Sequence, residues 1–406
     1  MKTSALAVFL LTLCVSARAQ QARVELGVDV YRTQPVDVVA GQAPTETRVR
    51  VGALVNAASM DSDGRRTVDV LKNNPRLDLV AIFSPEHGLS AIAEGEIADS
   101  RDSETGVPIY SAYGHSPDAR RPNPAVLKKL DVLVIDLPDV GVRQFTYKST
   151  LGIFLEEAGR AGVRVVVFDR PNPLNGVDVQ GPVWDGSGAA YVNYHALPQR
   201  HGMTIGELAM FFNAQRKFNV RLEVVRLRGW QRAMWFDQTG MVWARPSPNL
   251  PSADLVLPYA ALVMLEFTNV SVGRGTDAPF TALGAPWISG EKLAQYLNSR
   301  AIPGMRFQPA EFRPTTGPYA EQPCSGVRLV VTDRHIVDPA LVGVEVASAL
   351  LKLWPKQYDA KRLGELVGDA DITRAILTGE DPRAVQAQWQ ARLDEFVRLR
   401  ERYLQY

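Results

Sequence analysis

The stretch DVLVIDLPDVGVRQFTYKSTLGIFLEEAGRAGVRVVVFDR, residues 131–170, has an apolar run at each end and a helical pattern between them. A short continuous apolar run is typical of a strand that is buried on both faces of a sheet. In the middle, Leu151, Phe154, Leu155 and Ala158 recur at i, i+3, i+4 and i+7, which predicts an amphipathic helix. The stretch therefore predicts a strand, a helix and a second, parallel strand.

The same alternation of strands and helices continues outward from this stretch. Further strands are expected at 49–55, 79–83 and 221–227, and further helices at 67–73 and 204–213. Such alternation predicts an α/β domain whose parallel sheet is covered by helices on both faces.

Two domains are expected from the length of 406 residues. We place the parallel-sheet domain at 25–253, with a polar leader over 20–48, because Arg245-Pro-Ser-Pro-Asn-Leu-Pro251 is a rigid boundary segment. The remainder, 254–406, is expected to form a smaller α/β domain. Its predicted elements are a strand at 327–332, a helix at 339–353 and a helical tail.

Residues 1–19 have the pattern of a signal peptide. Lys2 gives a basic start, an apolar run follows at 5–15, and Ala17-Arg-Ala19 matches a cleavage site. The run is about half of a membrane span, and no other run reaches about 18 apolar residues. We therefore expect an exported protein, periplasmic or secreted, with no integral membrane segment after cleavage.

The charge balance and the cysteine count exclude several classes of protein. The chain has 45 basic and 44 acidic side chains, whereas binding to nucleic acid requires clustered lysine and arginine. Cys324 is the one cysteine beyond the export segment, which excludes an internal disulfide and a cysteine zinc cluster.

Carboxylates follow three of the predicted strands. Glu86 stands in Ser84-Pro-Glu-His-Gly88, while Asp136, Asp139 and Asp169 follow the two strands of the opening stretch. Ligands of open parallel sheets bind beyond the carboxyl ends of the strands. One carboxyl group there can protonate a leaving oxygen, and another can stabilise positive charge or activate water, as a hydrolase of polar substrates requires.

Each candidate also has a structural interpretation. Asp136 and Asp169 can simply cap loops through backbone N–H groups. Glu86 is the leading candidate, because an acid directly after a buried strand either meets solvent or is partly desolvated. His87 can take part in catalysis, bind a metal or orient Glu86. Arg274, between Gly273 and Gly275, can grip a carboxylate or make a structural ion pair.

Sequence motifs for cofactors are absent. The chain has no G-x-G-x-x-G after the first strand, no phosphate-binding G-x-x-x-x-G-K-[ST] and no G-x-S-x-G around a serine. His87, His195 and His201 are candidate metal ligands, yet none lies in an H-E-x-x-H pattern. We expect neither a metal nor another cofactor. Aromatic side chains that can stack on a sugar or pack a core are Trp184, Tyr191, Tyr194 and Trp287.

Several long motifs resemble those of a known family, the NamZ-type exo-β-N-acetylmuramidases. They are Ser84-Pro-Glu-His-Gly88, Tyr110-Ser-Ala-Tyr-Gly114, Asp136-Leu-Pro-Asp-Val-Gly-Val-Arg143, Phe145-Thr-Tyr147, Asp169-Arg-Pro-Asn-Pro-Leu-Asn-Gly176, Arg200-His-Gly-Met203, Pro246-Ser-Pro-Asn249, Thr268-Asn269, Gly273-Arg-Gly-Thr276 and Gly284-Ala-Pro-Trp287. The resemblance covers about residues 49–406 and implies a Rossmann-like N-terminal domain, a smaller α/β C-terminal domain and an active site between them. It also implies release of N-acetylmuramic acid from the non-reducing ends of peptidoglycan fragments, which are amino sugars or muropeptides.

The resemblance implies roles for individual residues. Glu86 is expected to be the general acid/base, oriented by His87. Candidates for the second carboxylate or for contacts with sugar hydroxyls are Asp136, Asp139 and Asp169. A second carboxylate is unnecessary if the substrate's own acetamido group participates, and the sequence leaves both mechanisms open. Arg143 and Arg274 are expected to grip the lactyl carboxylate of muramic acid. Further substrate contacts are expected from Tyr147, Arg170, Asn172, Asn175 and His201.

The chain departs from the family pattern at three places. Ser90-Ala91 stands where many relatives have Arg-Gly, Phe267 replaces a glycine, and Val272 replaces an acid. These departures leave the exact substrate open. Two other functions are also open, a metal-dependent hydrolase and a non-catalytic protein that binds sugars or muropeptides.

Overall fold

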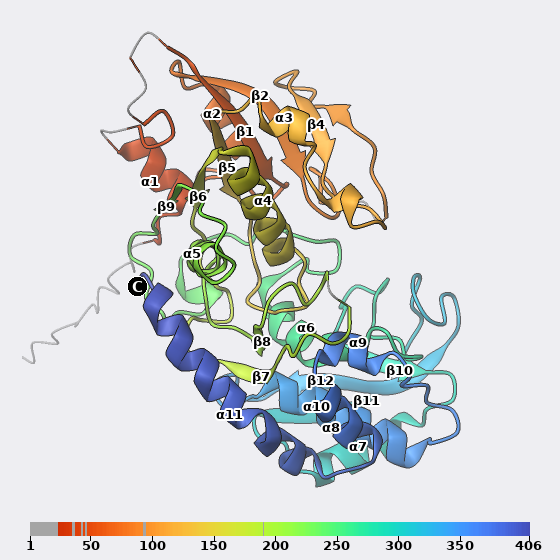
Figure 1. Cartoon of the computed structure of the whole chain (residues 1–406). Coiled ribbons are helices and arrows are strands. Elements are labelled where there is room, and N and C mark those ends of the chain that lie inside the picture. Colours follow the sequence, from red (N-terminus) through yellow and green to blue (C-terminus); the bar gives the residue numbers. More distant parts are fainter. Residues whose placement is uncertain (1–22, 35–36, 42–43, 45–46, 92–94, 190) are drawn as a thin grey trace, which may run out of the picture.

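A seven-stranded sheet forms the centre of the N-terminal half of the chain (Figure 1). The computed structural model describes residues 23–406 except 35–36, 42–43, 45–46, 92–94 and 190, so the predicted signal peptide lies outside the described residues. The strand order is β3-β4-β2-β1-β5-β6-β9, and all neighbours are parallel except the edge pair β3 and β4. The strands are β1 (Val49–Val55), β2 (Leu77–Ser84), β3 (Ser100–Arg101), β4 (Pro108–Ser111), β5 (Val132–Asp136), β6 (Arg164–Phe168) and β9 (Leu222–Val225). The predicted parallel α/β sheet is confirmed.

Helices cover both faces of this sheet, because side chains alternate between the faces along each strand. Val134 and Val166 pack in one cluster with the short helices of the first face, whereas Leu133 and Val165 pack with α4 and α5 on the second. The helices are α1 (Gly27–Thr33), α2 (Thr67–Lys72), α3 (Pro124–Leu127), α4 (Tyr147–Ala161) and α5 (Ile205–Gln215). Helix α5 begins with a capping box, in which the Thr204 hydroxyl accepts from the Glu207 N–H and the Glu207 side chain accepts from the Thr204 N–H.

The segment expected to be a polar leader contains α1, so that prediction was wrong. Val28 and Val30 of this helix are buried against the sheet. Gly27 permits the close approach, since a Cβ there would lie 2.4 Å from the backbone nitrogen of Asp169. The apolar residues recur over too short a span for their helical period to stand out in the sequence.

The C-terminal half contains a smaller antiparallel sheet with strand order β10-β12-β11. Its elements are β10 (Ala282–Ala285), β11 (Met305–Phe312), β12 (Cys324–Val331), α6 (Val256–Leu262), α7 (Gly290–Ser299), α8 (Pro339–Leu353), α9 (Leu363–Val367), α10 (Ala370–Leu377) and α11 (Pro382–Arg400). A two-stranded sheet of β7 (Gln180–Val183) and β8 (Pro198–Arg200) lies beside α11 and α8. None of the described helices has both the length and the apolar composition of a membrane span.

Helix α11 runs back from the C-terminal half, and the chain ends beside β9 and α5 of the N-terminal half (Figure 1). The backbone N–H of Gln405 donates to Glu207 Oε1 at 2.8 Å, and the Tyr406 hydroxyl donates to Asp169 Oδ2 at 2.6 Å. The two halves are thus joined by the end of the chain as well as by the 245–251 segment. The boundary at 253 and 254 stays a prediction.

Candidate active site

Glu86 lies in a turn directly after β2, at the carboxyl edge of the sheet. The turn is closed by a hydrogen bond from the Gly88 N–H to the Pro85 carbonyl oxygen, 3.0 Å long. The Glu86 side chain is half-buried, and its Oε2 accepts from the Thr146 hydroxyl at 2.5 Å. Thr146 is the residue before α4, so the carboxylate lies at the N-terminus of a 15-residue helix, where the helix dipole favours negative charge.

Tyr147 connects the turn of Glu86 to the boundary segment. Its buried hydroxyl lies 2.6 Å from the carbonyl oxygen of Pro246 and 3.2 Å from that of Glu86, and it accepts from Asn56 Nδ2 at 2.8 Å. Burial raises the pKa of Tyr147 well above its ordinary value. Tyr147 is therefore a neutral donor that positions the backbone of the Glu86 turn.

Two further tyrosines and an arginine form a cluster on which the charge of Glu86 acts. The rings of Tyr113 and Tyr191 are 6.3 Å apart, and the guanidinium carbon of Arg120 lies 4.0 Å from the centroid of the Tyr191 ring. Burial and the charge of Glu86 both raise the pKa of Tyr113, which also hydrogen bonds to Glu86. Burial and Glu86 likewise raise the pKa of Tyr191, while Arg120 opposes both shifts. Stacking surfaces, a carboxylate and a cation thus share one site.

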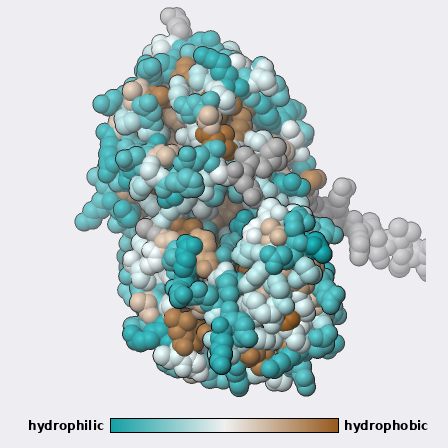
Figure 2. Space-filling view, turned by 90° about the vertical axis from the view of Figure 1, so that its right-hand side faces the viewer, coloured by the Kyte–Doolittle hydropathy of each residue, from teal (hydrophilic) through white to brown (hydrophobic). Residues whose placement is uncertain are grey.

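The C-terminal half contributes Arg274 and Tyr259 to the same site. Arg274 forms an ion pair with Glu266, and its charge also acts on the Tyr113 hydroxyl. Burial is the main cause of the raised pKa of Tyr259, with Glu86 among the charges that act on its hydroxyl. Figure 2 shows the surface hollowed at mid-height, between the upper and lower halves of the molecule. The site therefore lies where the two halves meet.

Asp136 is held in an internal ion pair. Its side chain is fully buried, Arg170 binds both carboxylate oxygens, and the Thr67 hydroxyl donates to Oδ2 at 2.5 Å. Arg170 also donates to the Met60 carbonyl oxygen at 2.9 Å. These contacts favour a structural role for Asp136 and Arg170 over the predicted roles in catalysis and substrate binding.

Asp169 is also engaged within the fold. Its buried carboxylate accepts from the Thr204 hydroxyl at 2.8 Å, the Gly206 N–H at 2.7 Å and the Tyr406 hydroxyl at 2.6 Å. Burial raises its pKa to about 6 in spite of these donors. The carboxylate caps α5 and anchors the end of the chain, which is the structural alternative rather than the catalytic one.

Asp139 and His201 form a buried pair. His201 Nδ1 accepts from the Met203 N–H at 3.2 Å, so Nε2 carries the proton of the neutral ring and donates to Asp139 Oδ2 at 3.1 Å. Oδ2 of Asp139 also accepts from the Gly141 N–H at 2.7 Å, whereas its Oδ1 is buried and has no hydrogen-bond partner among the described residues. Both side chains lie beneath the loop that follows β5.

The remaining predicted contact residues lie in the interior or in turns. Arg143 is fully buried, and its guanidinium donates to the Asn193 side chain and to the Val367 carbonyl oxygen. Asn172 and Asn175 accept from backbone N–H groups within their own loop. These geometries favour structural roles, and contacts of the three residues with a substrate stay predictions.

The three histidines that could bind a metal are not brought together. His201 is bound to Asp139, while the ring of His195 lies 5.0 Å from that of Phe211 and 5.4 Å from that of Phe212. Burial lowers the pKa of His195 to about 4. Within the described part of the chain, no group of three or more histidine, cysteine, aspartate or glutamate side chains has the geometry of a metal site.

The backbone of His87 is left-handed, with φ of 71°, a conformation that residues other than glycine rarely adopt. A strained backbone of this kind is frequent at functional sites. Its proposed task of orienting Glu86 stays a prediction.

The sequence reasoning overlooked Thr146, Tyr113 and Arg120. Thr146 and Tyr113 stand inside motifs that were singled out, Phe145-Thr-Tyr147 and Tyr110-Ser-Ala-Tyr-Gly114. A signal was therefore present for these two residues. Arg120 stands outside every such motif, and its place beside Tyr191 is set by a contact between residues 71 positions apart.

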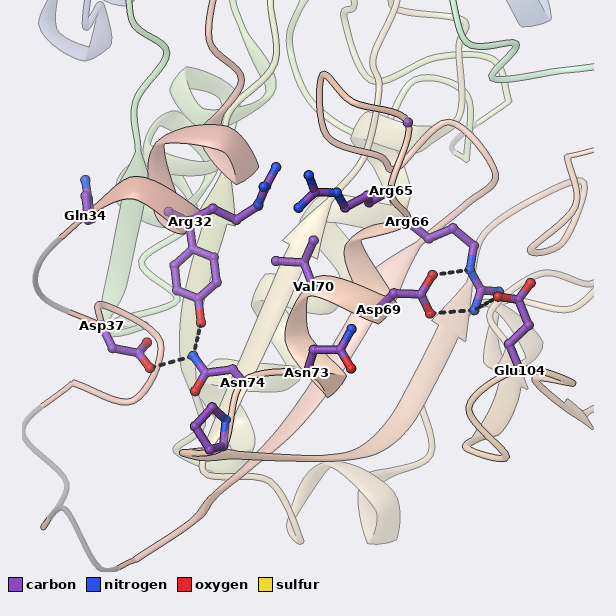
Figure 3. A pocket seen from close by; sticks show the side chains of 13 residues that line it. Arg32, Gln34, Asp37, Arg65, Arg66, Asp69, Val70, Asn73, Asn74 and Glu104 are labelled. Carbon is purple, nitrogen blue, oxygen red and sulfur yellow. Dashed lines mark hydrogen bonds and ion pairs between the residues drawn. The ribbon is translucent and has the colours of Figure 1, made fainter.

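Two of the cavities elsewhere in the N-terminal half lie near α1 or over the strand ends. One, of about 860 Å³, is an open polar depression between α1 and α2, where Arg66 points toward Asp69 and Glu104 (Figure 3). The other, of about 460 Å³, lies over the carboxyl ends of β1, β5 and β6 and has apolar walls that include Val242. Neither cavity is lined by Glu86.

Comparisons with known proteins cover most of the chain, including both halves. Residues 51–254 match the family model "Exo-beta-N-acetylmuramidase NamZ, N-terminal", and residues 257–406 match the corresponding C-terminal model. The peptidoglycan beta-N-acetylmuramidase NamZ of Bacillus subtilis is 35% identical over 393 residues, which are 96% of this chain and 92% of that protein.

Two crystal structures of DUF1343 family proteins from Bacteroides fragilis are similar to this chain. One has a TM-score of 0.85 at 31% identity, and the other has a TM-score of 0.75 at 26% identity. Each comparison covers 95% of this chain and 99% of the other chain. The likeness therefore includes both halves and their arrangement.

Proposed function

This chain belongs to the NamZ family of exo-β-N-acetylmuramidases and is a glycoside hydrolase, and on that premise we propose that it releases N-acetylmuramic acid from the non-reducing ends of peptidoglycan fragments. One observation carries the proposal. Of the four carboxylates at the strand ends, only Glu86 is half-buried rather than buried, and it lies among tyrosines at the meeting of the two halves. A partly exposed carboxyl group at this position can reach the glycosidic oxygen of a bound substrate, as a general acid must.

Glu86 donates its proton to the glycosidic oxygen as the bond from C1 to that oxygen breaks. The other three strand-end carboxylates are buried and held by Arg170, by His201 and by Thr204 with Tyr406, so none of them is presented to C1 as a nucleophile. This favours attack on C1 by the carbonyl oxygen of the substrate's own acetamido group. Water then opens the resulting ring, and Glu86 takes the proton from that water.

The test uses a chromogenic β-N-acetylmuramide as substrate. Wild type is expected to release the chromophore, and Glu86→Gln is expected to lower kcat by about 10²–10⁴-fold, the usual contribution of a general acid. The matched control is Glu104→Gln on the open depression of Figure 3, whose activity should equal that of wild type.

Three results would count against parts of this proposal. Wild type that binds a muropeptide without release supports the sugar-binding alternative, and activity abolished by a chelator supports the metal-dependent one. If Glu86→Gln is as active as wild type, Glu86 is not the general acid. A thiazoline analogue of the intermediate should inhibit competitively, and absence of inhibition would contradict attack by the acetamido group.

We also propose that the enzyme is exported, since residues 1–19 have the basic, apolar and cleavage segments of a signal peptide. N-terminal sequencing of protein recovered from the periplasm or the medium should begin at Gln20. Recovery of the activity in the cytoplasm with Met1 retained would contradict export.

A further inference from the structure

Muramic acid differs from glucosamine by a lactyl ether that carries a carboxylate, so a selective site needs a cation in reach of that group. Three arginines named from the sequence are already engaged. Arg143 is fully buried, Arg170 is paired with Asp136, and Arg274 is paired with Glu266. The residue that recognises the lactyl group is therefore to be sought among the other cations near Glu86.

Arg120 is the cation whose surroundings fit this task. Its Nε donates to the Gly114 carbonyl oxygen at 2.8 Å, and its guanidinium stacks on the Tyr191 ring at 4.0 Å. Its remaining hydrogen bond among the described residues, 3.4 Å long, goes to the carbonyl oxygen of His115. All of these partners are uncharged, whereas the neighbouring Arg121 is neutralised by Glu156 and Glu157.

The location of Arg120 places it in the active site. It stacks on Tyr191, whose ring lies 6.3 Å from that of Tyr113, and the charges of both Arg120 and Glu86 act on the hydroxyls of these two tyrosines. The side chain is partly exposed, and Nη1 has no hydrogen bond among the described residues. The bond to Gly114 and the stack on Tyr191 fix the plane of the guanidinium before any ligand binds, which reduces the entropy lost on binding.

We propose that Arg120, oriented by Tyr191, binds the lactyl carboxylate and selects acidic amino sugars over neutral ones. This inference rests on the proposed function and names the specificity-determining residue of the same site. A guanidinium and a carboxylate can form two parallel N–H···O bonds, which a neutral ester or a free hydroxyl cannot accept equally well. Arg120 acts on binding and positioning, while proton transfer remains with Glu86.

The experiment pairs two enzymes with two substrates. Wild type and Arg120→Gln are each assayed on the chromogenic β-N-acetylmuramide and on its lactyl methyl ester, which removes the charge and adds one methyl group. Wild type is expected to prefer the acid over the ester by about 10- to 100-fold in kcat/KM, the range of one charge-assisted hydrogen-bonded pair. In Arg120→Gln this preference should fall to less than about threefold, with the loss mainly in KM.

Two control variants separate recognition from folding. Arg121→Gln removes the adjacent arginine, whose partners lie on α4, and should keep the preference of wild type. Arg120→Lys keeps the positive charge but lacks the planar guanidinium that can form two parallel hydrogen bonds. It should therefore recover only part of the preference for the acid over the ester. Thermal unfolding of each variant shows whether the fold is intact.

The outcomes distinguish this inference from the proposed function. Release from neither substrate by wild type overturns the proposed function and this inference with it. An active wild type whose preference for the acid is unchanged in Arg120→Gln overturns this inference alone. A preference lost equally in Arg121→Gln and Arg120→Gln also overturns it, because the effect is then not specific to Arg120.

Discussion

Replacing Tyr406, the last residue of the chain, with phenylalanine tests whether Asp169 is a structural or a catalytic carboxylate. The Tyr406 hydroxyl donates to Asp169 Oδ2 at 2.6 Å and accepts from the Leu227 N–H at 2.9 Å. Phenylalanine keeps the ring that packs edge-on against Trp230, with centroids 5.1 Å apart, so the substitution removes the two hydrogen bonds alone.

The expected cost follows from the two bonds. A hydrogen bond to a charged group contributes about 1.5–3 kcal/mol, and a backbone N–H left without an acceptor costs about 1–3 kcal/mol, so the free energy of unfolding should fall by about 2.5–6 kcal/mol. The Tyr406 hydroxyl also lowers the pKa of Asp169, which burial raises to about 6. Without the hydroxyl the pKa of Asp169 rises further, so the folded state binds a proton more tightly than the unfolded state over a wider range of pH. The loss of stability should therefore be larger at pH 8 than at pH 5.

Urea unfolding at both pH values, followed by tryptophan fluorescence, measures this loss. The matched control is Tyr403→Phe. The Tyr403 hydroxyl accepts from Gln215 at the surface, so its removal should lower the free energy of unfolding by less than about 1 kcal/mol. The dependence of kcat on pH should be the same in Tyr406→Phe and wild type. If Tyr406→Phe is as stable as Tyr403→Phe, the bond between Tyr406 and Asp169 does not stabilise the fold, contrary to the expectation. If the pH profile of kcat shifts in Tyr406→Phe, Asp169 takes part in catalysis.

Three other perturbations test the same structure. Thr146→Val removes the donor to Glu86 and should lower kcat about 10-fold while the free energy of unfolding falls by less than about 1.5 kcal/mol; unchanged kinetics would contradict the positioning role. Asp136→Asn breaks the buried pair with Arg170 and should lower the free energy of unfolding in urea by about 3–5 kcal/mol. A variant that is stable but inactive would instead indicate that Asp136 takes part in catalysis. Burial lowers the pKa of Lys148 to about 7, so the unfolded state binds more protons above that pH. The free energy of unfolding should then rise by up to about 1.4 kcal/mol per pH unit from pH 7 to pH 10, and Lys148→Met should lack this rise in parallel titrations.

The buried strands could be predicted because their information is local. A strand covered on both faces is a mostly apolar run, so the predicted strands coincided with β1, β2, β5 and β6. The edge strand β9, in which Glu223 is exposed, was also predicted. The antiparallel C-terminal sheet was largely missed, since β11 and β10 have no such run. In β11, exposed side chains such as Arg306 and Gln308 flank the buried Phe307.

The sequence by itself determined the parallel sheet, the turn that presents Glu86 and the motifs that resemble those of the family. Only the tertiary structure decided which of the polar residues remain available to a substrate. Asp169 is bound by Tyr406, 237 positions away, and Arg143 by Val367, 224 positions away, so nothing near either residue in the sequence shows that it is engaged. A buried charge must find its partners wherever the fold brings them, whereas an apolar run or a turn is specified by its own neighbours.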